Sequence, residues 1–143
     1  MNEDLPYSFL STPIANRPVN IEWPIYAAGI ISFETMFNNE FISNTWAHFI
    51  FRQNFKGYLL KIGEWNPDIE FVMSAIVGTL NKPELHRNID FKTLEKGFYE
   101  TGVEINKMWN GLGVGVYYRF GPYSLPETAD NFSVKVTARI NLF

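Results

Sequence analysis

The last part of the sequence contains two long runs in which apolar side chains alternate with polar or small ones. Apolar residues occupy every second position from Leu112 to Phe120, and the pattern returns from Ser133 to Leu142 after a turn-rich segment. A period of two predicts β-strands, because successive side chains of a strand point to opposite faces. Each run has about the 9–11 residues that a tilted strand needs to cross a bilayer. The two runs therefore predict a hairpin of the kind found in outer-membrane β-barrels.

Four earlier segments show similar alternation and predict further strands. These segments are Ile25–Phe37, Glu40–Phe55, Asp68–Leu80 and Phe98–Met108. We expect tight turns at Asn38–Asn39 and at Asn110–Gly111, since Asn and Gly tolerate positive φ angles. The predicted fold is all-β, an antiparallel transmembrane β-barrel portion of about six strands that is incomplete on its own.

The N-terminal part of the chain differs from the rest. Residues 1–24 hold four prolines, which disfavour a long strand ladder, and we expect an extended Pro-rich loop there. Residues 25–143 carry the predicted barrel strands, and the polar segment Asn81–Lys96 predicts a long surface loop. Residues Met1–Pro6 lack the basic segment and apolar core of a signal peptide. We therefore expect the chain to be a piece of a longer precursor.

Composition excludes several classes of function. A net charge of −3 gives no indication of a nucleic-acid partner. The chain has no cysteine, which excludes a disulfide framework and thiolate metal sites. No apolar run reaches the length of about 18 residues that a transmembrane helix requires.

The two faces of the predicted strands differ in polarity. The apolar faces carry no charged residue apart from Lys107 at a strand end, and an Arg or Lys at the bilayer midplane costs about 2–4 kcal/mol. The candidates for lipid-facing residues are Phe49, Phe51, Phe71, Val114, Val116, Val134, Val136 and Ile140. The opposite faces gather ionic side chains, and the lumen-facing candidates are His48, Arg52, Glu70, Glu100, Glu104, Arg119, Lys135 and Arg139. A soluble antiparallel sheet with one buried face would show the same alternation.

Aromatic residues make up 17% of the chain, and many lie near the ends of the predicted strands. They include Trp65, Tyr99, Trp109, Tyr117, Tyr118, Tyr123 and Phe143. Amphipathic rings favour the headgroup zone of a membrane, although ordinary core packing also uses aromatic residues.

Several segments resemble one family of Gram-negative envelope proteins. The segments are Glu40–Ser43, Asn88–Gly102, Tyr118–Tyr123 and the ending after Asp130–Phe132. They resemble the C-terminal region of "carboxypeptidase-like regulatory domain" proteins that have a C-terminal domain of unknown function. The resemblance covers nearly all of the chain and is most specific at Asn88–Gly102. It implies a secreted protein with a small β-sandwich first and an outer-membrane barrel after it, and it implies no peptidase activity.

A second, weaker similarity concerns the order of elements. A long loop and the Glu40–Phe41 pair precede five final strands, which is similar at the level of fold to the end of an Omp85-type barrel, the assembly and translocation class.

About six strands are fewer than the eight of the smallest bacterial barrels. A sheet that stays open would leave unpaired edges in lipid, which a bilayer does not tolerate. We expect the missing strands to come from the same polypeptide, from another chain or from self-association. The expected partners are thus outer-membrane lipid and further barrel strands, and an envelope protein complex is a further candidate.

Catalytic chemistry has little support in the sequence. His48 and His86 are the only histidines, so a zinc site would need carboxylates at unsupported spacing. The Gly-rich segment 111–115 leads into a strand, with no helix N-terminus to bind phosphate. Glu100 and Glu104 would share a face, as the carboxylates of a glycosidase do, but a pair of lumen charges explains them more simply. We expect no enzyme, no cofactor and no metal.

The sequence therefore predicts the C-terminal part of a non-catalytic outer-membrane barrel in a Gram-negative envelope, with a role in transport, in protein translocation or assembly, or in scaffolding. The alternative is a soluble β-barrel or sandwich that binds a small apolar ligand in its interior.

Overall fold

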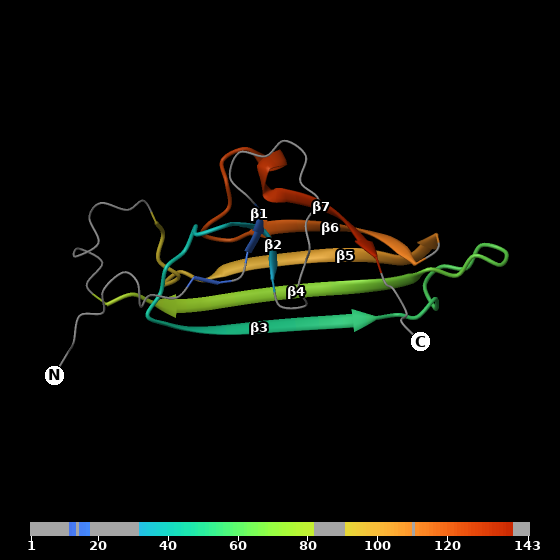
Figure 1. The fold of residues 1–143 in the computed structure, drawn as a ribbon, viewed down its shortest axis with the longest axis horizontal. Helices are drawn as coiled ribbons and strands as arrows, with labels where there is room; N and C mark the ends of the chain where they lie inside the picture. The colour runs from blue at the N-terminus through green and yellow to red at the C-terminus, as the bar shows by residue number, and fades with distance from the viewer. Residues whose placement is uncertain (1–11, 14, 18–31, 82–90, 110, 139–143) are drawn as a thin grey trace.

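The computed structural model describes residues 12–13, 15–17, 32–81, 91–109 and 111–138, and it is all-β. Its elements are β1 (Ala15–Arg17), β2 (Phe33–Phe37), β3 (Thr45–Asn54), β4 (Asp68–Thr79), β5 (Phe98–Trp109), β6 (Leu112–Phe120), the short 3-10 helix η3 (Thr128–Asn131) and β7 (Phe132–Ala138). Five strands form one antiparallel sheet in the order β3-β4-β5-β6-β7 (Figure 1). The antiparallel all-β fold predicted from the sequence is confirmed, and the sheet is open, not closed into a barrel.

Each strand of the large sheet follows the previous one in both sequence and space. The predicted segment Leu112–Phe120 is β6 itself, and β4 and β5 differ from their predicted segments by one residue at the C-terminal end. In the ladder, Phe71 pairs with Val103, and Val103 pairs in turn with Val116. This register aligns apolar residues across neighbouring strands, so that one face of the sheet is apolar along its length.

The first predicted strand, Ile25–Phe37, takes a different place from the one expected. Its described part, β2, lies outside the large sheet and pairs with β1 in parallel. A turn does follow at Asn38–Asn39, where Asn39 has a φ of 60°, but it leads to no hairpin between β2 and β3. The large sheet therefore has five strands, and the sixth candidate lies across it.

Strand β1 falls within residues 1–24, for which we expected an extended loop. Ala15 pairs with Phe33 and Arg17 with Phe37, with an irregular register between them. Apart from residues 12–13 and β1, this N-terminal segment lies outside the described residues.

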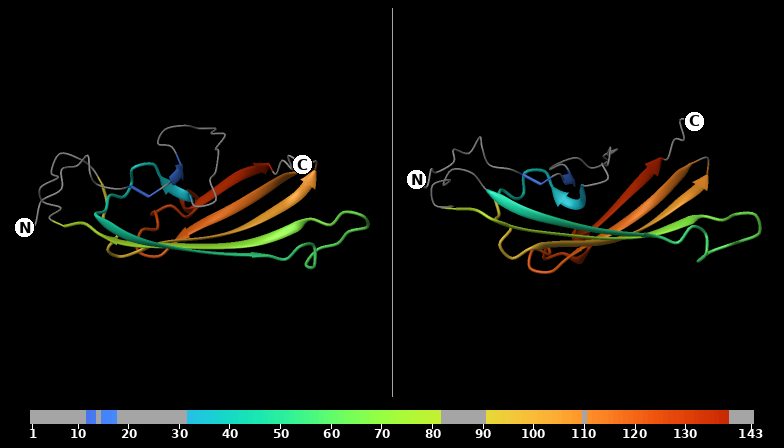
Figure 2. Two further views of the ribbon diagram at one scale, coloured as in Figure 1. Left: turned by 60° about the horizontal axis from the view of Figure 1, so that its bottom comes forward. Right: turned by 90° about the horizontal axis from the view of Figure 1, so that it is seen from below.

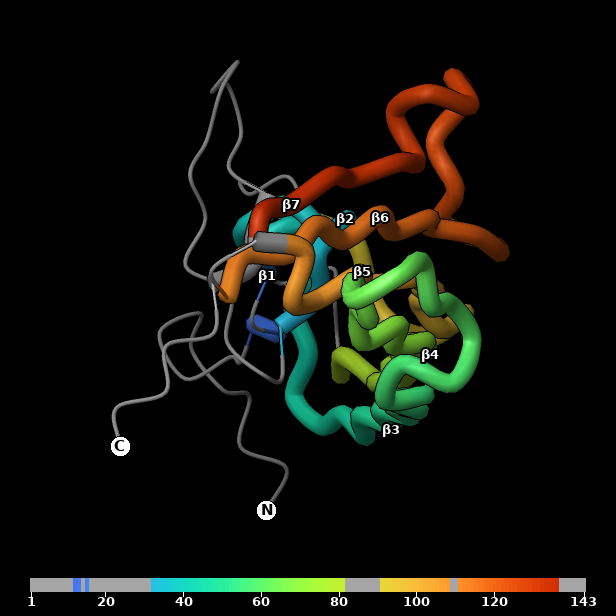
Figure 3. The backbone as a smooth tube through the Cα atoms, turned by 90° about the vertical axis from the view of Figure 1, so that its right-hand side faces the viewer, coloured from blue at the N-terminus to red at the C-terminus, as the bar shows by residue number. Residues whose placement is uncertain are grey.

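The large sheet is curved, and β1 and β2 lie on its concave side (Figures 2 and 3). β2 packs there against β5, β6 and β7. A small apolar core joins the two layers, and it consists of Phe33, Met36, Phe41, Ile76, Leu94 and Phe98. The rings of Phe33 and Phe98 meet edge to face at a centroid distance of 5.2 Å.

Leu94 belongs to the segment Asn81–Lys96, which we predicted to be a surface loop. The structure instead buries Leu94 completely and joins Lys92 to Phe41 by a β-bridge. Residues 82–90 of this segment lie outside the described residues.

The predicted tight turn between β5 and β6 is confirmed. Trp109 pairs with Leu112, and Gly111 has a φ of 84°, which glycine adopts without strain. The register of this pair shifts between Ile105 and Trp109, and Lys107 has a φ of 59° there. Such a bulge bends a strand and increases its twist.

Candidate functional site

The convex face of the large sheet is apolar and exposed. On β3, the side chain of Phe49 is 61% exposed, and on β7 that of Val136 is 68% exposed. Exposed large apolar residues on this face occur on every strand of the sheet, and they are Phe49, Phe51, Phe71, Met73, Val77, Val103, Leu112, Val116, Phe132, Val134 and Val136. A continuous apolar surface of this kind marks a place where a membrane or another protein layer is bound.

Charged side chains avoid this face. Among the described residues of β3 to β7, the alternate positions that form the convex face hold no Asp, Glu or Arg, and Lys107 stands in the bulge near the end of β5. Its Nζ atom lies 2.8 Å from Oδ2 of Asp68 at the rim of the sheet. The expectation that charge is excluded from the apolar faces therefore holds for the described strands.

The concave face has the opposite character, because its ionic side chains are buried. The exposed fraction is 1% for Glu100, 3% for Glu104 and 0% for Arg119. Buried charges of this kind require partners, since an isolated ion loses its hydration without compensation. The structure supplies those partners in three groups of contacts.

The first group is centred on Glu104. Its Oε1 atom lies 2.9 Å from Nη2 of Arg52 and 3.4 Å from Nζ of Lys135, and the hydroxyl of Tyr117 donates a hydrogen bond to the same atom. Asn106 adds a longer hydrogen bond of 3.4 Å to Oε2 of Glu104. One carboxylate on β5 thus connects side chains from β3, β6 and β7.

The same group extends at both ends. Arg52 also contacts Glu70 on β4, with Nε and Oε1 2.6 Å apart. Lys135 also contacts Glu34 on β2, with Nζ and Oε1 2.7 Å apart. We call this group the Glu104 network, and its members are Glu34, Arg52, Glu70, Glu104, Asn106, Tyr117 and Lys135. It joins β2 to all five strands of the large sheet.

The second group ties the backbone of β2 to the sheet. Glu100 accepts hydrogen bonds from the backbone N–H of Thr35 at 2.6 Å, from the hydroxyl of Thr35 at 2.6 Å, and from the backbone N–H of Glu34 at 3.1 Å. A carboxylate here satisfies backbone donors that a neighbouring strand would otherwise satisfy.

The third group is a buried ion pair between Arg119 and Glu40. The guanidinium of Arg119 donates to both carboxylate oxygens of Glu40, at 3.0 Å and 2.6 Å, and its Nε donates to the carbonyl of Tyr123 at 2.5 Å. The ring of Phe98 lies under the guanidinium, 4.8 Å from Cζ. Lys92 completes the site, with its Nζ 2.8 Å from Oε1 of Glu40.

These contacts determine the ionisation of Glu40. Burial alone would raise the pKa of its carboxyl, but the hydrogen bonds from Arg119 and Lys92 outweigh burial and lower the pKa below its usual value. Glu40 is therefore a carboxylate at neutral pH, and its charge is part of the contact between the segment after β2 and the end of β6.

A glycine makes room for the Tyr117 ring on the concave face. A Cβ atom at Gly102 would stand 2.4 Å from Cδ1 of Tyr117, much closer than real Cβ atoms approach a ring. The ring thus lies flat over the backbone of β5, which brings its hydroxyl to Glu104. This close approach gives the reason for a glycine at position 102.

Most of the residues that we predicted to face a lumen do share the concave face. His48, Arg52, Glu70, Glu100, Glu104, Arg119 and Lys135 occupy its alternate positions, and Arg139 lies outside the described residues. His48 does not join the ionic contacts. Its ring stacks on Phe33 at a centroid distance of 4.5 Å, and its buried Nε2 has no hydrogen-bond partner among the described residues.

The residues that we predicted to face lipid lie on the convex face. Phe49, Phe51, Phe71, Val114, Val116, Val134 and Val136 take the positions of that face, and Ile140 lies outside the described residues.

Sequence reasoning missed several partners of the ionic residues. Tyr117 alternates in phase with Arg119, so its place on the concave face could have been inferred from the period of two. Glu34, Thr35 and Glu40 gave no such signal. They belong to segments outside the large sheet, and their contacts depend on how β2 crosses it.

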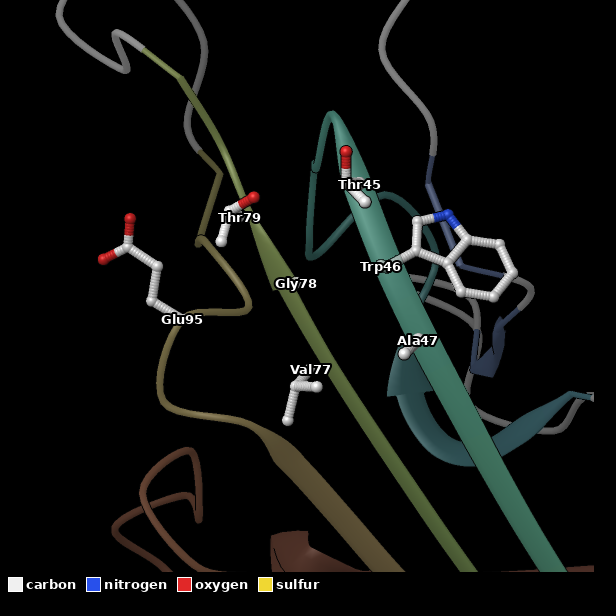
Figure 4. Close-up of a pocket in the computed structure, with 7 residues that line it drawn as sticks. All are labelled: Thr45, Trp46, Ala47, Val77, Gly78, Thr79 and Glu95. Carbon is white, nitrogen blue, oxygen red and sulfur yellow. The ribbon is translucent and has the colours of Figure 1, made fainter.

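One shallow pocket of about 350 Å³ lies where β3 begins and β4 ends (Figure 4). Thr45, Ala47, Val77 and Thr79 line it from the convex face, and Glu95 stands at its side. The concave face beneath β2 is instead filled by ionic side chains and by the small apolar core.

The described part of the chain contains no cluster of three His, Cys, Asp or Glu residues suited to a metal ion. Within the same residues, no helix is long and apolar enough to cross a membrane. Comparisons with known proteins found no matching protein-family model, no matching curated protein and no matching solved structure.

Proposed function

We propose that this chain is part of a non-catalytic β-barrel in the outer membrane of a Gram-negative bacterium. The observation that carries the proposal is the inverted polarity of the sheet, whose buried face is ionic and whose exposed face is apolar. A soluble sheet turns its apolar face toward a core and its charges toward water. A membrane barrel does the reverse, with apolar side chains toward lipid and polar ones inside.

The dimensions of the strands support this proposal. β3 has 10 residues, β4 and β5 have 12 each, and β6 has 9, whereas a tilted strand needs about 9–11 residues to cross a bilayer. Aromatic rings gather at one end of the convex face, where Tyr99 stacks on Phe120 and Tyr118 packs against Phe132. Rings at that level fit the headgroup zone of a membrane.

The arrangement of the concave face weighs against the alternative of a soluble barrel with an apolar ligand in its interior. The side chains that would line such an interior are the ionic residues of the Glu104 network, and β2 lies over them. An apolar ligand would have to displace buried charges, which costs far more free energy than its own burial supplies.

Within the barrel class, the weaker similarity to the end of an Omp85-type barrel, the assembly and translocation class, favours a role in protein translocation or assembly. β2 and its contacts occupy the concave face, which supports scaffolding, protein translocation or gated transport over free diffusion through an open pore.

The test of this proposal uses single-cysteine variants. Because the sequence has no cysteine, the introduced thiol is the only one that can be labelled. Val116→Cys places a thiol on the convex face of β6, and Ser124→Cys places one in the exposed loop between β6 and β7. In membranes of cells that make the protein, a water-soluble maleimide should label Ser124→Cys and leave Val116→Cys unlabelled. A nitroxide attached to lipid chains should quench a fluorophore on Val116→Cys only.

The protein should also stay in the membrane pellet after alkaline washing and leave it only with detergent. A protein that is soluble without detergent, or a Val116→Cys thiol that reacts as fast as Ser124→Cys, would rule out the membrane proposal. The first of these results would favour a second protein layer on the convex face.

A further inference from the structure

The two edges of the large sheet run in the same direction. Each strand from β3 to β7 runs antiparallel to its neighbour, so the direction alternates along the sheet. Because three strands, β4, β5 and β6, lie between the two edge strands, β3 and β7 have the same direction. β3 and β7 therefore both run from the rim that holds Thr45 and Phe132 to the opposite rim. Six strands in one sheet would have given edges of opposite direction, but β2 lies outside this sheet.

Each edge strand has a partner on one side only within the described residues. β3 pairs with β4 and β7 pairs with β6, so the outer N–H and C=O groups of both strands lack a neighbouring strand there. The three most exposed large apolar side chains of the convex face also lie on the edge strands. Their exposed fractions are 61% for Phe49, 62% for Val134 and 68% for Val136, against 43% for Val116 on β6. A neighbouring strand would cover both the backbone and these side chains.

A second copy of the chain fits this gap poorly. A copy inserted the same way round would place its β3 beside β7 of the first copy, and both seams would be parallel, whereas bacterial barrels are built of antiparallel strands. An inverted copy would give antiparallel seams, but its loops would lie on the opposite side of the membrane. Copies of one chain are inserted from the same side, so they share one orientation.

Resting on the proposed membrane function, we propose that the sheet is closed by an odd number of strands, at least three, that come from outside residues 33–138. The two outer strands of this complement run antiparallel to β3 and to β7. Three added strands give the eight of the smallest bacterial barrels, and any larger closure keeps the same parity.

The edges also define the chemistry of this complement. Beside β3 it presents apolar side chains next to Phe49 and Phe51 on the convex face and polar ones on the face of Arg52, whose side chain is still 29% exposed. Beside β7 it presents the same alternation next to Val134 and Lys135. The partner strands thus have a period of two in phase with the edges.

The test places a photo-crosslinking amino acid at one residue at a time in the protein as its own cells make it. Positions Ala47 and Gln53 report on the edge at β3, and Phe132 and Val136 report on the edge at β7. Val103 on the central strand β5 is the matched control, since it has a similar outward position but neighbours on both sides. Crosslinked peptides are identified by mass spectrometry.

We expect the edge at β3 and the edge at β7 to crosslink to two different segments from outside residues 33–138. On each edge, the crosslinked residue number should fall as the probe moves toward the C-terminus, as antiparallel pairing requires. Val103 should give no such segment.

Three results would overturn the inference. Crosslinks to β3 or β7 of a second copy would show self-association. Crosslinks of both edges to one and the same strand would mean a barrel of six strands, with one added strand instead of at least three. Lipid adducts alone would show that the edges stay open. None of these results decides whether lipid covers the convex face, because that is tested separately by extraction without detergent and by the accessibility of Val116→Cys.

Discussion

The two faces of the large sheet obtain their order from different kinds of interaction. On the convex face, apolar residues stand in register across the strands and stay exposed, as Val116 and Val134 do. On the concave face, buried ionic side chains are held by partners from other segments of the chain, as Arg119 is by Glu40. The order of the convex face therefore depends on its surroundings, whereas the ionic side chains of the concave face find their partners within the chain.

The largest effect should come from the concave face. Replacing Arg119 by Met removes a fully buried cation and leaves the Glu40 carboxylate without its main partner, which should lower the free energy of unfolding by about 3–5 kcal/mol. The measurement is denaturant unfolding of the membrane-inserted protein.

Lys92→Met is the matched control for Arg119→Met, because Lys92 contacts the same Glu40 oxygen but its side chain is 46% exposed. Its effect should stay within about 1 kcal/mol, the range of exposed ion pairs. Adding Glu40→Gln to Arg119→Met should restore part of the lost stability. Equal losses for Arg119→Met and Lys92→Met would mean that burial does not distinguish the two cations.

An intermediate effect is expected on the convex face. Val116→Arg puts a charge in the middle of the apolar rows, and it should cost about 2–4 kcal/mol of folding free energy in phospholipid vesicles. The same change on a face that meets water would fall within about 0.5 kcal/mol. Ser124→Arg in the loop before β7 serves as the control and should leave the folding free energy nearly unchanged. A small effect of Val116→Arg would mean that lipid does not cover the convex face.

The smallest effect is a dependence of stability on pH that comes from Glu40. Because the pKa of Glu40 is lower in the folded protein than in the unfolded chain, its contribution to stability is complete above the unfolded pKa of about 4.3 and is lost as the pH falls through the folded value. Unfolding midpoints of wild type and Glu40→Gln should therefore converge as the pH is lowered from about 5. A constant difference over this range would mean that Glu40 does not titrate with unfolding.

How much the sequence predicts differs between the same two faces. The strands β3 to β7 and the residues on each of their faces follow from a period of two, which is a local signal that needs no knowledge of the fold. The tight turn before Leu112 follows equally from Asn110–Gly111. The convex face was therefore predictable residue by residue.

The partners on the concave face were not predictable in this way. Thr35 and Glu100 are 65 residues apart, and Glu40 and Arg119 are 79 apart, so no local pattern connects them. The alternation around Phe33–Phe37 predicts a strand of the large sheet, and this segment does form a strand, β2. Its backbone, however, is satisfied by β1 and by the Glu100 carboxylate, which only the folded chain reveals.

The position of β2 has a consequence for electrical leakage across the membrane. In the proposed barrel, β2 stands where an aqueous path would run, and Glu34 and Thr35 attach it to β7 and β5. Breaking those attachments should therefore raise the conductance above that of the resting protein.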